Sequence, residues 1–335
     1  MNSIKYHYVS TAAQLQEALE VCGRAEAVAV DTEFARFNTY YPIVGLIQLG
    51  TSEACFLVDP LAISDLSPLK QILAKPSIMK VFHACSEDIE VFQHALGFVP
   101  KPLHDTQIAA AVLGVGFSMS YQSIVEYYLS ISLPKDQTRS NWLARPLSQD
   151  QLRYAALDVI HLLQVYERQR EHLSSADKGR WVAEESANLG LDIPTMVDPK
   201  LVYQRVKGLW QLDRRQLNQL RFLCAWREET ARLEDVPRNR IVDQKTLMTI
   251  VRRNLGDLPG LHQYANMTPR QLRKYGDKIV EVLKIAGQTR EESLPDLVIK
   301  DDLPVSSSTL KRLKKVVQER AAALSVAPEL LMKRR

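Results

Sequence analysis

AVAVDTEFARF, residues 27–37, is the stretch that decides the fold. Four consecutive Ala and Val residues predict a buried strand, and two carboxylates, Asp31 and Glu33, follow one residue apart. Alternate residues of a strand point to the same side, so we expect the pair on one face at the end of the strand. Carboxylates at strand ends also serve as helix caps or loop acceptors, so the pair alone does not establish a site.

Two more apolar segments, GLIQLG at 45–50 and ACFLVDP at 54–60, follow through connections too short for a crossover helix. Such connections predict an antiparallel meander. After Pro60 the pattern predicts a helix at 67–75, a strand at 79–84, a helix at 86–97, a short strand at 101–105 and one helix over 149–170. Strands that alternate with helices after a meander indicate an α/β fold, a mixed sheet flanked by helices.

The second half of the chain is predicted to be helical. Residues 191–209 contain two prolines and show no periodicity, which is typical of a linker. Apolar residues recur at helical spacing within 214–235, and Asp243 and the pair Thr268–Pro269 are signals for helix starts. The predicted organisation is a first domain at 1–190, a linker at 191–209, an all-helical domain at 210–290 and a basic helical segment at 291–335.

Charge is distributed unevenly along the 335 residues, whose net charge is +4. Residues 1–170 carry −4 and the remainder carries +8, so the two parts are expected to do different jobs. Binding of a polyanion by the basic half is one interpretation, and a solvated helical surface is the other. The four cysteines lack CxxC spacing, and neither a secretory signal nor a long apolar run is visible. These features predict a cytoplasmic protein.

Three further residues join the acidic pair as candidates for chemistry. Asp88 lies near the start of the helix that follows strand 79–84, where α/β sheets collect ligands, although a first-turn Asp also favours the helix dipole. Tyr154 and Asp158 stand at i and i+4, on one helical face beside core positions. Converging carboxylates need a counter-charge, which two divalent cations would supply. Oxygen ligands favour Mg²⁺ or Mn²⁺ and phosphoryl chemistry over zinc.

These residues resemble the exonuclease motifs of the DEDD superfamily, in the subclass with Tyr in the third motif: DTEF at 31–34, HACSEDIEVF at 83–92 and YAALD at 154–158. Longer stretches, among them LHDTQIAAAVLG and NWLARPLSQDQLRYAALDV, resemble the ribonuclease D family. The region at about 210–288 resembles the HRDC domain that follows the nuclease in that family. The segment at 291–335 is similar to the opening of a second HRDC domain, so we expect either a truncated chain or a diverged tail.

The resemblance implies a ribonuclease H-like fold and 3′–5′ removal of nucleotides from single-stranded RNA ends, with release of 5′-mononucleotides. Precursor tRNA is the implied substrate, and a monomer is expected. Asp31, Glu33 and Asp158 would hold a first cation, Mg²⁺ or Mn²⁺. Asp31 and Asp88 would hold a second, and Tyr154 would orient the nucleophile.

Four residues are candidate substrate contacts. Phe34, Tyr40 and Tyr41 could stack on bases, and Arg145 could meet a phosphate, although core packing and a structural salt bridge explain such residues equally well.

Two other functions are open, and a third is disfavoured. The carboxylates also suit a 3′–5′ exodeoxyribonuclease, and an inactive nucleic-acid-binding module could keep the fold. A third alternative, an HD phosphohydrolase built on His83, His104–Asp105 and Asp158, is disfavoured because that family is all-helical and strands are expected here.

Overall fold

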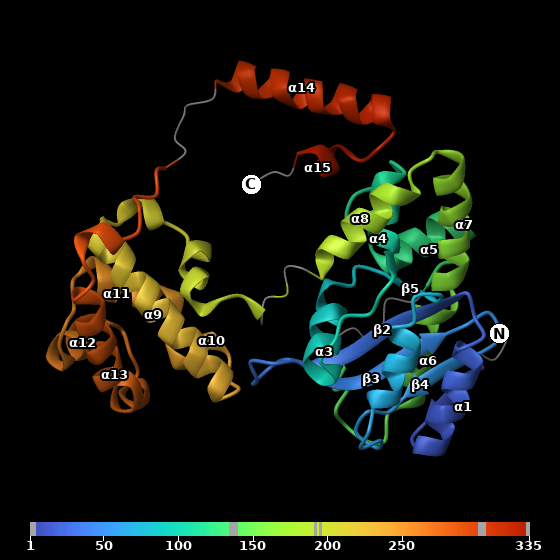
Figure 1. Cartoon of the computed structure of the whole chain (residues 1–335), viewed down its shortest axis with the longest axis horizontal. Coiled ribbons are helices and arrows are strands. Elements are labelled where there is room, and N and C mark those ends of the chain that lie inside the picture. The colour runs from blue at the N-terminus through green and yellow to red at the C-terminus, as the bar shows by residue number, and fades with distance from the viewer. Residues whose placement is uncertain (1–4, 134–139, 191–192, 194–195, 301–305, 333–335) are drawn as a thin grey trace. The chain divides into compact units, whose positions relative to one another are not determined.

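The computed structural model describes residues 5–133, 140–190, 193, 196–300 and 306–332. The chain forms two compact units (Figure 1). The sheet unit comprises the described residues up to Ala35, those from Pro42 to Ile193, and those from 306 onward. The helical unit comprises Arg36–Tyr41 and the described residues from 196 to 300. A short segment of the first half of the chain, 36–41, therefore belongs to the helical unit.

The sheet unit is built on a mixed sheet of strands in the order β1-β4-β3-β2-β5-β6. Strands β2, β3 and β4 are antiparallel neighbours, whereas β5 and β6 run parallel to β2, and β1 runs parallel to β4. The bounds are β1 His7–Val9, β2 Ala27–Ala35, β3 Ile43–Gly50, β4 Cys55–Val58, β5 Met79–Phe82 and β6 Leu103–Asp105. The predicted meander and mixed sheet are confirmed, while β1 and the helix after it were not predicted.

Helices pack on both faces of the sheet. Val28 and Val30 of β2 lie in one core with α1, α2 and α3, and Ala29 between them lies in the opposite core with α6 and α7. Asp31 and Glu33 follow Ala29 at alternate positions of the strand. Both therefore face the same side of the sheet as Ala29, the side that α6 covers. The helices are α1 Ala12–Cys22, α2 Lys70–Leu73, α3 Ser86–Leu96, α4 Thr106–Val112, α5 Tyr121–Leu129, α6 Gln149–Ile160, α7 Leu162–Ser175 and α8 Gly179–Leu189.

The single helix predicted over 149–170 is wrong: the structure has two helices that meet at His161. The first, α6, begins with a capping box in which Ser148 accepts from the amide of Gln151 at 3.2 Å. Helical periodicity continues through the break, which is why the sequence pattern does not reveal it. Tyr154 and Asp158 both fall within α6, so their predicted i, i+4 relationship holds.

The strand pair β2–β3 contains a bulge beside the acidic residues. Glu33 pairs with Leu46 but Phe34 pairs with Val44, so Gly45 of β3 has no partner on β2. A Cβ at Gly45 would lie 2.6 Å from the carbonyl oxygen of Trp142, which only a glycine avoids. Bulges of this kind redirect neighbouring side chains and are frequent next to active sites.

The helical unit is an all-α assembly around one apolar core. Its helices are α9 Arg214–Leu233, α10 Arg238–Ile241, α11 Gln244–Arg252, α12 Leu258–Tyr264 and α13 Pro269–Gly287. The predicted starts are confirmed: Asp243 caps α11, and Thr268 caps α13 with Pro269 at its first position. Of the predicted linker, residues 191, 192, 194 and 195 lie outside the described residues, and Pro199–Arg205 forms a 3-10 helix of the helical unit.

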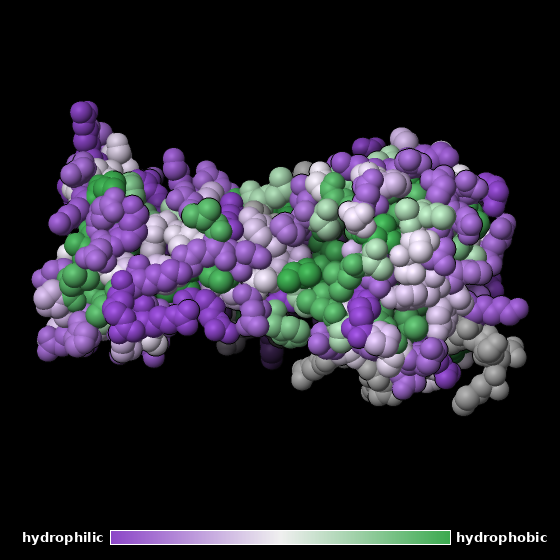
Figure 2. Space-filling model, turned by 90° about the horizontal axis from the view of Figure 1, so that it is seen from below, coloured by the Kyte–Doolittle hydropathy of each residue, from purple (hydrophilic) through white to green (hydrophobic). Residues whose placement is uncertain are grey.

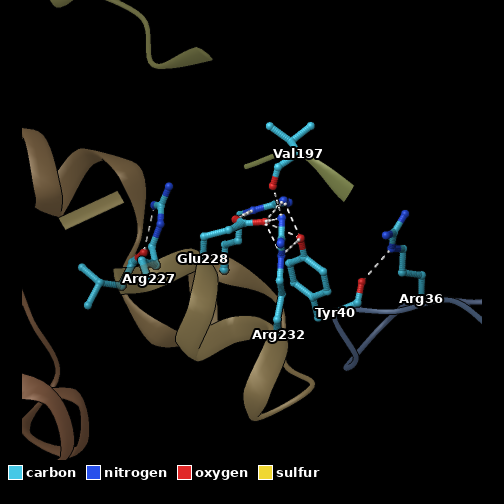
Figure 3. A network of polar contacts seen from close by, with 8 residues as sticks. Arg36, Tyr40, Val197, Arg227, Glu228 and Arg232 are labelled. Carbon is cyan, nitrogen blue, oxygen red and sulfur yellow. Dashed lines mark hydrogen bonds and ion pairs between the residues drawn. The ribbon is translucent and has the colours of Figure 1, made fainter. Parts of the chain in front are cut away.

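Tyr40 anchors the segment 36–41 in this core. Its side chain is 4% exposed, and its hydroxyl donates to Glu228 of α9, beside the guanidinium groups of Arg232 and Arg238 (Figure 3). The amides of Tyr40 and Tyr41 each donate to Asp235 Oδ1 at 3.0 Å.

The last two helices, α14 (Ser307–Leu324) and α15 (Pro328–Leu331), belong to the sheet unit. The amide of Ala327 donates to the carbonyl of Ala111 at 2.8 Å, and Lys178 Nζ donates to the carbonyl of Ser325 at 2.7 Å. Residues 301–305 and 333–335 of the predicted terminal segment lie outside the described residues.

Across the described part of the chain, every helix is too short or too polar to cross a membrane. In the view of Figure 2, hydrophilic side chains dominate the surface of the helical unit, and hydrophobic side chains gather over part of the sheet unit.

Candidate active site

A pocket of about 270 Å³ lies in the sheet unit, at the end of β2. It is lined by all five residues that the sequence singles out for chemistry: Asp31, Glu33, Asp88, Tyr154 and Asp158. They come from three elements, β2, α3 and α6. The remaining lining residues are Thr32, Phe34, His83, Ala84, Glu87, Tyr121 and Leu162.

Three of the carboxylates form a compact group. Asp31, Glu33 and Asp158 each offer an oxygen atom, and these oxygens lie within 4.8 Å of one another. The pair on β2 meets Asp158 because α6 covers the face of the sheet to which both residues of the pair point. Gln48, from the neighbouring strand β3, lies with its Nε2 3.5 Å from Asp31 Oδ2. The spacing of the three carboxylate oxygens allows them to share one divalent cation as ligands.

Asp88 enters the pocket from the first turn of α3 and does not belong to that compact group. Its side chain is 7% exposed, and its Oδ1 accepts a hydrogen bond of 2.5 Å from the hydroxyl of Thr32. Thr32 lies between the two acidic residues of β2, so this bond ties the start of α3 to the strand that carries them.

The electrostatics of the pocket call for positive charge. Burial raises the pKa of Glu33 to about 10, with further contributions from the charges of Asp31 and Asp158. Burial likewise raises the pKa of Asp158 to about 8. The pKa values of Asp31 and Asp88 lie well above the usual range, first through burial and then through the neighbouring carboxylates. These carboxyl groups resist being ionised at the same time, but a divalent cation beside them would stabilise their ionised forms. The set of oxygen donors therefore fits such ions.

Tyr154 is kept as a neutral phenol. Its pKa is raised by burial and by the charges of Asp158, Glu33 and Asp31. The hydroxyl is hydrogen-bonded with Asp158, four residues along α6, and the ring lies 6.2 Å from that of Trp142. A neutral phenol beside a carboxylate can orient a water molecule by hydrogen bonding but is a weak base.

The four predicted substrate contacts lie in different surroundings. Phe34 lines the pocket. Tyr40 is buried in the helical unit, and Tyr41 packs against the same core. Arg145 donates to both oxygens of Asp59, at 2.7 and 2.6 Å, and to the carbonyl of Gly45 at 2.7 Å. The guanidinium therefore supports the β2–β3 bulge.

Two residues that line the pocket, His83 and Tyr121, could hardly be predicted from the sequence to lie there. His83 directly follows β5, as ligand-binding residues at strand ends do, and its ring nitrogens contact Thr106 Oγ1 at 2.9 Å and the carbonyl of Met119 at 3.1 Å. Tyr121 carries no functional signal in the sequence. Its hydroxyl donates to the carbonyl of Leu157 at 2.9 Å, one residue before Asp158. A contact across 36 residues has no local pattern that could predict it.

Comparisons with known protein families agree with this geometry. A 3′–5′ exonuclease family matches residues 6–174, and the HRDC domain family matches residues 216–283. The fold and the acidic pocket therefore define a 3′–5′ exonuclease that depends on divalent metal ions and carries an HRDC domain.

Among its relatives, the ribonuclease D of Pseudomonas paraeruginosa is 42% identical over 311 residues, which cover 92% of this chain and 82% of the relative. The ribonuclease D of Escherichia coli is 35% identical over 333 residues, which cover 99% of this chain and 88% of that protein. The chain belongs to the ribonuclease D family, and it is by class a hydrolytic exoribonuclease.

Two solved structures extend the comparison. The crystal structure of Escherichia coli RNase D, an exoribonuclease involved in structured RNA processing, matches with a TM-score of 0.90 at 34% identity, over 98% of this chain and 88% of the other. The catalytic core of RRP6 from Trypanosoma brucei matches with a TM-score of 0.65 at 25% identity, over 85% of this chain and 80% of the other. The predicted ribonuclease D-like architecture is thus confirmed.

Proposed function

We propose that this chain shortens RNA from single-stranded 3′ ends and releases 5′-mononucleotides with the help of two divalent cations, Mg²⁺ or Mn²⁺. The observation that carries the proposal is the convergence of Asp31, Glu33, Asp88, Asp158 and Tyr154 in a single pocket of about 270 Å³. The donors are oxygen atoms, which suits phosphoryl chemistry with hard cations.

In this proposal the acidic residues are divided between two cations. Asp31, Glu33 and Asp158, whose oxygens lie within 4.8 Å of one another, hold one cation. Asp31 is shared with a second cation, to which Asp88 contributes from α3. When bound, the two cations lower the pKa of the attacking water and stabilise the departing 3′ oxygen. Thr32 holds the Asp88 carboxylate in place through its hydroxyl.

Tyr154 positions the nucleophile. Its raised pKa keeps the phenol protonated, so the hydroxyl can hydrogen-bond a water molecule next to Asp158 without competing for its proton. Among the predicted substrate contacts we retain Phe34, because its ring lines the pocket and could stack on the terminal base.

We propose RNA as the substrate, with precursor tRNA as the natural candidate. The relatives that support RNA are ribonuclease D proteins, one of them described as acting in structured RNA processing. The acidic residues themselves do not distinguish ribose from deoxyribose, since only a contact with the 2′-hydroxyl would do so. The cytoplasmic location and the monomeric state stay predictions.

One assay tests the chemistry and the choice of nucleic acid together. The full chain is incubated with matched single-stranded RNA and DNA and with a tRNA carrying a 3′ extension, each with Mg²⁺ and with EDTA. We expect mononucleotide release from RNA and from the extended tRNA with Mg²⁺, and no release with EDTA. Asp31→Asn and Asp158→Asn should each slow release more than about a hundredfold, because each removes a charge that holds a cation.

Asp150→Asn is the matched control, since Asp150 is an exposed first-turn residue of the same helix, α6. Its rate should equal that of the parent. Undiminished turnover in Asp158→Asn would overturn the two-cation assignment. Faster degradation of the DNA strand would favour the exodeoxyribonuclease alternative, and release of nucleotides in EDTA would exclude a metal-dependent reaction.

A further inference from the structure

Asp105, the last residue of β6, holds the turn that leads from β5 into the acidic pocket. In the parallel pair β5–β6 it lies beside Phe82, the last residue of β5. Its side chain is 1% exposed. Its Oδ1 accepts from the amide of Ala84 at 3.2 Å, and its Oδ2 accepts from the amide of Cys85 at 2.9 Å. One buried carboxylate thus fixes two consecutive residues of the turn.

This turn has a backbone conformation that needs support. Ala84 has a φ of +56°, in the left-handed region that residues with a Cβ rarely adopt. Cys85 is the N-cap of α3, but its side chain makes no capping hydrogen bond. Ala84 lines the pocket, and Asp88 follows in the first turn of α3. The backbone at 84–85 therefore sets where α3 begins and where its acidic residue lies.

The same carboxylate has a second task, which a test must separate from the first. Asp105 is the N-cap of α4, and its Oδ1 accepts from the amides of Gln107 at 2.8 Å and Ile108 at 3.2 Å. Asn is an equally good N-cap residue. With its amide oxygen at the place of Oδ1, Asn keeps the cap and the bond to Ala84, while its NH₂ group faces the amide of Cys85. Asp105→Asn therefore removes mainly the bond to Cys85.

We propose that Asp105 is a positioning residue for Asp88: it fixes the turn at 84–85, and through this turn it places the Asp88 carboxylate in the pocket. The proposal rests on the proposed function in one respect, the role of Asp88 in holding a cation. The hold on the turn is independent of that role. Asp105, which belongs to the disfavoured HD phosphohydrolase pattern in the sequence, thus supports the pocket without lining it.

Residue-resolved hydrogen exchange on the full chain in EDTA tests the hold on the turn. Asp105→Asn should accelerate exchange of the Cys85 amide about tenfold or more, while Gln107 and Ile108 change less than about twofold because the cap persists. Titration with Mn²⁺ in the absence of RNA tests the consequence for the site. We expect an affinity about tenfold lower, as is usual when a residue that orients a ligand is changed.

A second substitution and a control sharpen the result. Ala84→Gly in the Asp105→Asn background should restore most of the Mn²⁺ affinity, because glycine adopts a positive φ without strain. Asp243→Asn is the matched control: Asp243 caps α11 in the helical unit by accepting from the amide of Thr246 at 2.7 Å. Its Mn²⁺ affinity should equal that of the parent.

The outcomes are separable. Unchanged exchange at Cys85 in Asp105→Asn overturns the hold on the turn, and faster exchange with unchanged Mn²⁺ affinity overturns the link to Asp88. Full Mn²⁺ binding and turnover in Asp88→Asn would instead reject the proposed function of Asp88. If Asp105→Asn does not fold, the double variant decides: a folded protein with near-parental affinity supports the proposal, and an unfolded one overturns it.

Discussion

Replacing the buried carboxylate of Glu228 by an amide, Glu228→Gln, should destabilise the helical unit by about 2–3 kcal/mol. The Glu228 side chain is fully buried and accepts from Arg232 Nη2 at 3.0 Å, from Arg238 Nη2 at 2.7 Å and from the hydroxyl of Tyr40 (Figure 3). Breaking a buried ion pair costs about 3–5 kcal/mol. We expect less because the Arg232 and Arg238 side chains are 21% and 36% exposed and can regain water, and because Gln keeps one acceptor.

Native-state hydrogen exchange of the full chain measures this effect locally. A loss of about 2–3 kcal/mol corresponds to exchange roughly 30- to 150-fold faster for the most protected amides of α9. Glu229→Gln, at the exposed neighbouring position in the same helix, should change these rates less than about twofold. Rates in Glu228→Gln within about threefold of the parent would refute the reasoning.

The same network predicts how stability depends on pH. Burial alone would raise the pKa of Glu228, but hydrogen bonds from Arg238 and Tyr40 outweigh it and hold the pKa below its ordinary value of 4.5. A carboxyl group whose pKa is lower in the folded chain than in the unfolded chain stabilises the fold at pH values above its unfolded pKa. This stabilisation is lost as the pH falls through the folded pKa. The difference between the parent and Glu228→Gln should therefore be constant above about pH 5.5 and shrink below pH 4.5. A difference that grows on acidification would contradict this sign.

Two substitutions test the pocket and its support. Tyr154→Phe should lower kcat about 10- to 100-fold and leave the Kd for RNA unchanged, because we propose that the hydroxyl orients water rather than substrate. A loss confined to binding would give the tyrosine another role. Gly45→Ala should destabilise the sheet unit by about 1–3 kcal/mol, because the new Cβ would lie 2.6 Å from the carbonyl of Trp142. Gly179→Ala, where a Cβ meets nothing within 4 Å, is the control for thermal unfolding. Equal melting temperatures of Gly45→Ala and the parent would show that the bulge tolerates a side chain.

The central part of the site was predictable because it rests on local spacing. Asp31 and Glu33 share a strand face at i and i+2, and Tyr154 and Asp158 share a helix face at i and i+4. These relationships depend only on secondary structure and not on tertiary contacts. The packing of α6 on the sheet then brings the Asp31–Glu33 pair and the Tyr154–Asp158 pair together. The caps at Asp243 and Thr268 were readable for the same reason, since a cap involves residues within one turn.

What the sequence did not reveal depends on contacts between distant residues. β1 is a three-residue edge strand, too short to show a period. The apolar pattern of 149–170 continues through the break at His161, because α6 and α7 each bury an apolar face. Arg145 finds Asp59, 86 positions earlier, and this pairing rather than any local motif determines its surroundings.

The segment 36–41 shows why composition and contacts divide this chain differently. By sequence it continues the strand of Asp31 and Glu33, but its Tyr40 is part of the core of the helical unit. A fragment ending near residue 190 would expose this ring and leave the amides of Tyr40 and Tyr41 without Asp235. Because the segment begins two residues after Phe34, such a fragment disturbs the strand that carries Asp31 and Glu33 as well as removing basic surface. Neutralising single charges in the full chain is therefore a better measure of what the basic helices contribute to RNA affinity. In such variants, a changed dependence of RNA affinity on salt concentration reports phosphate contacts alone.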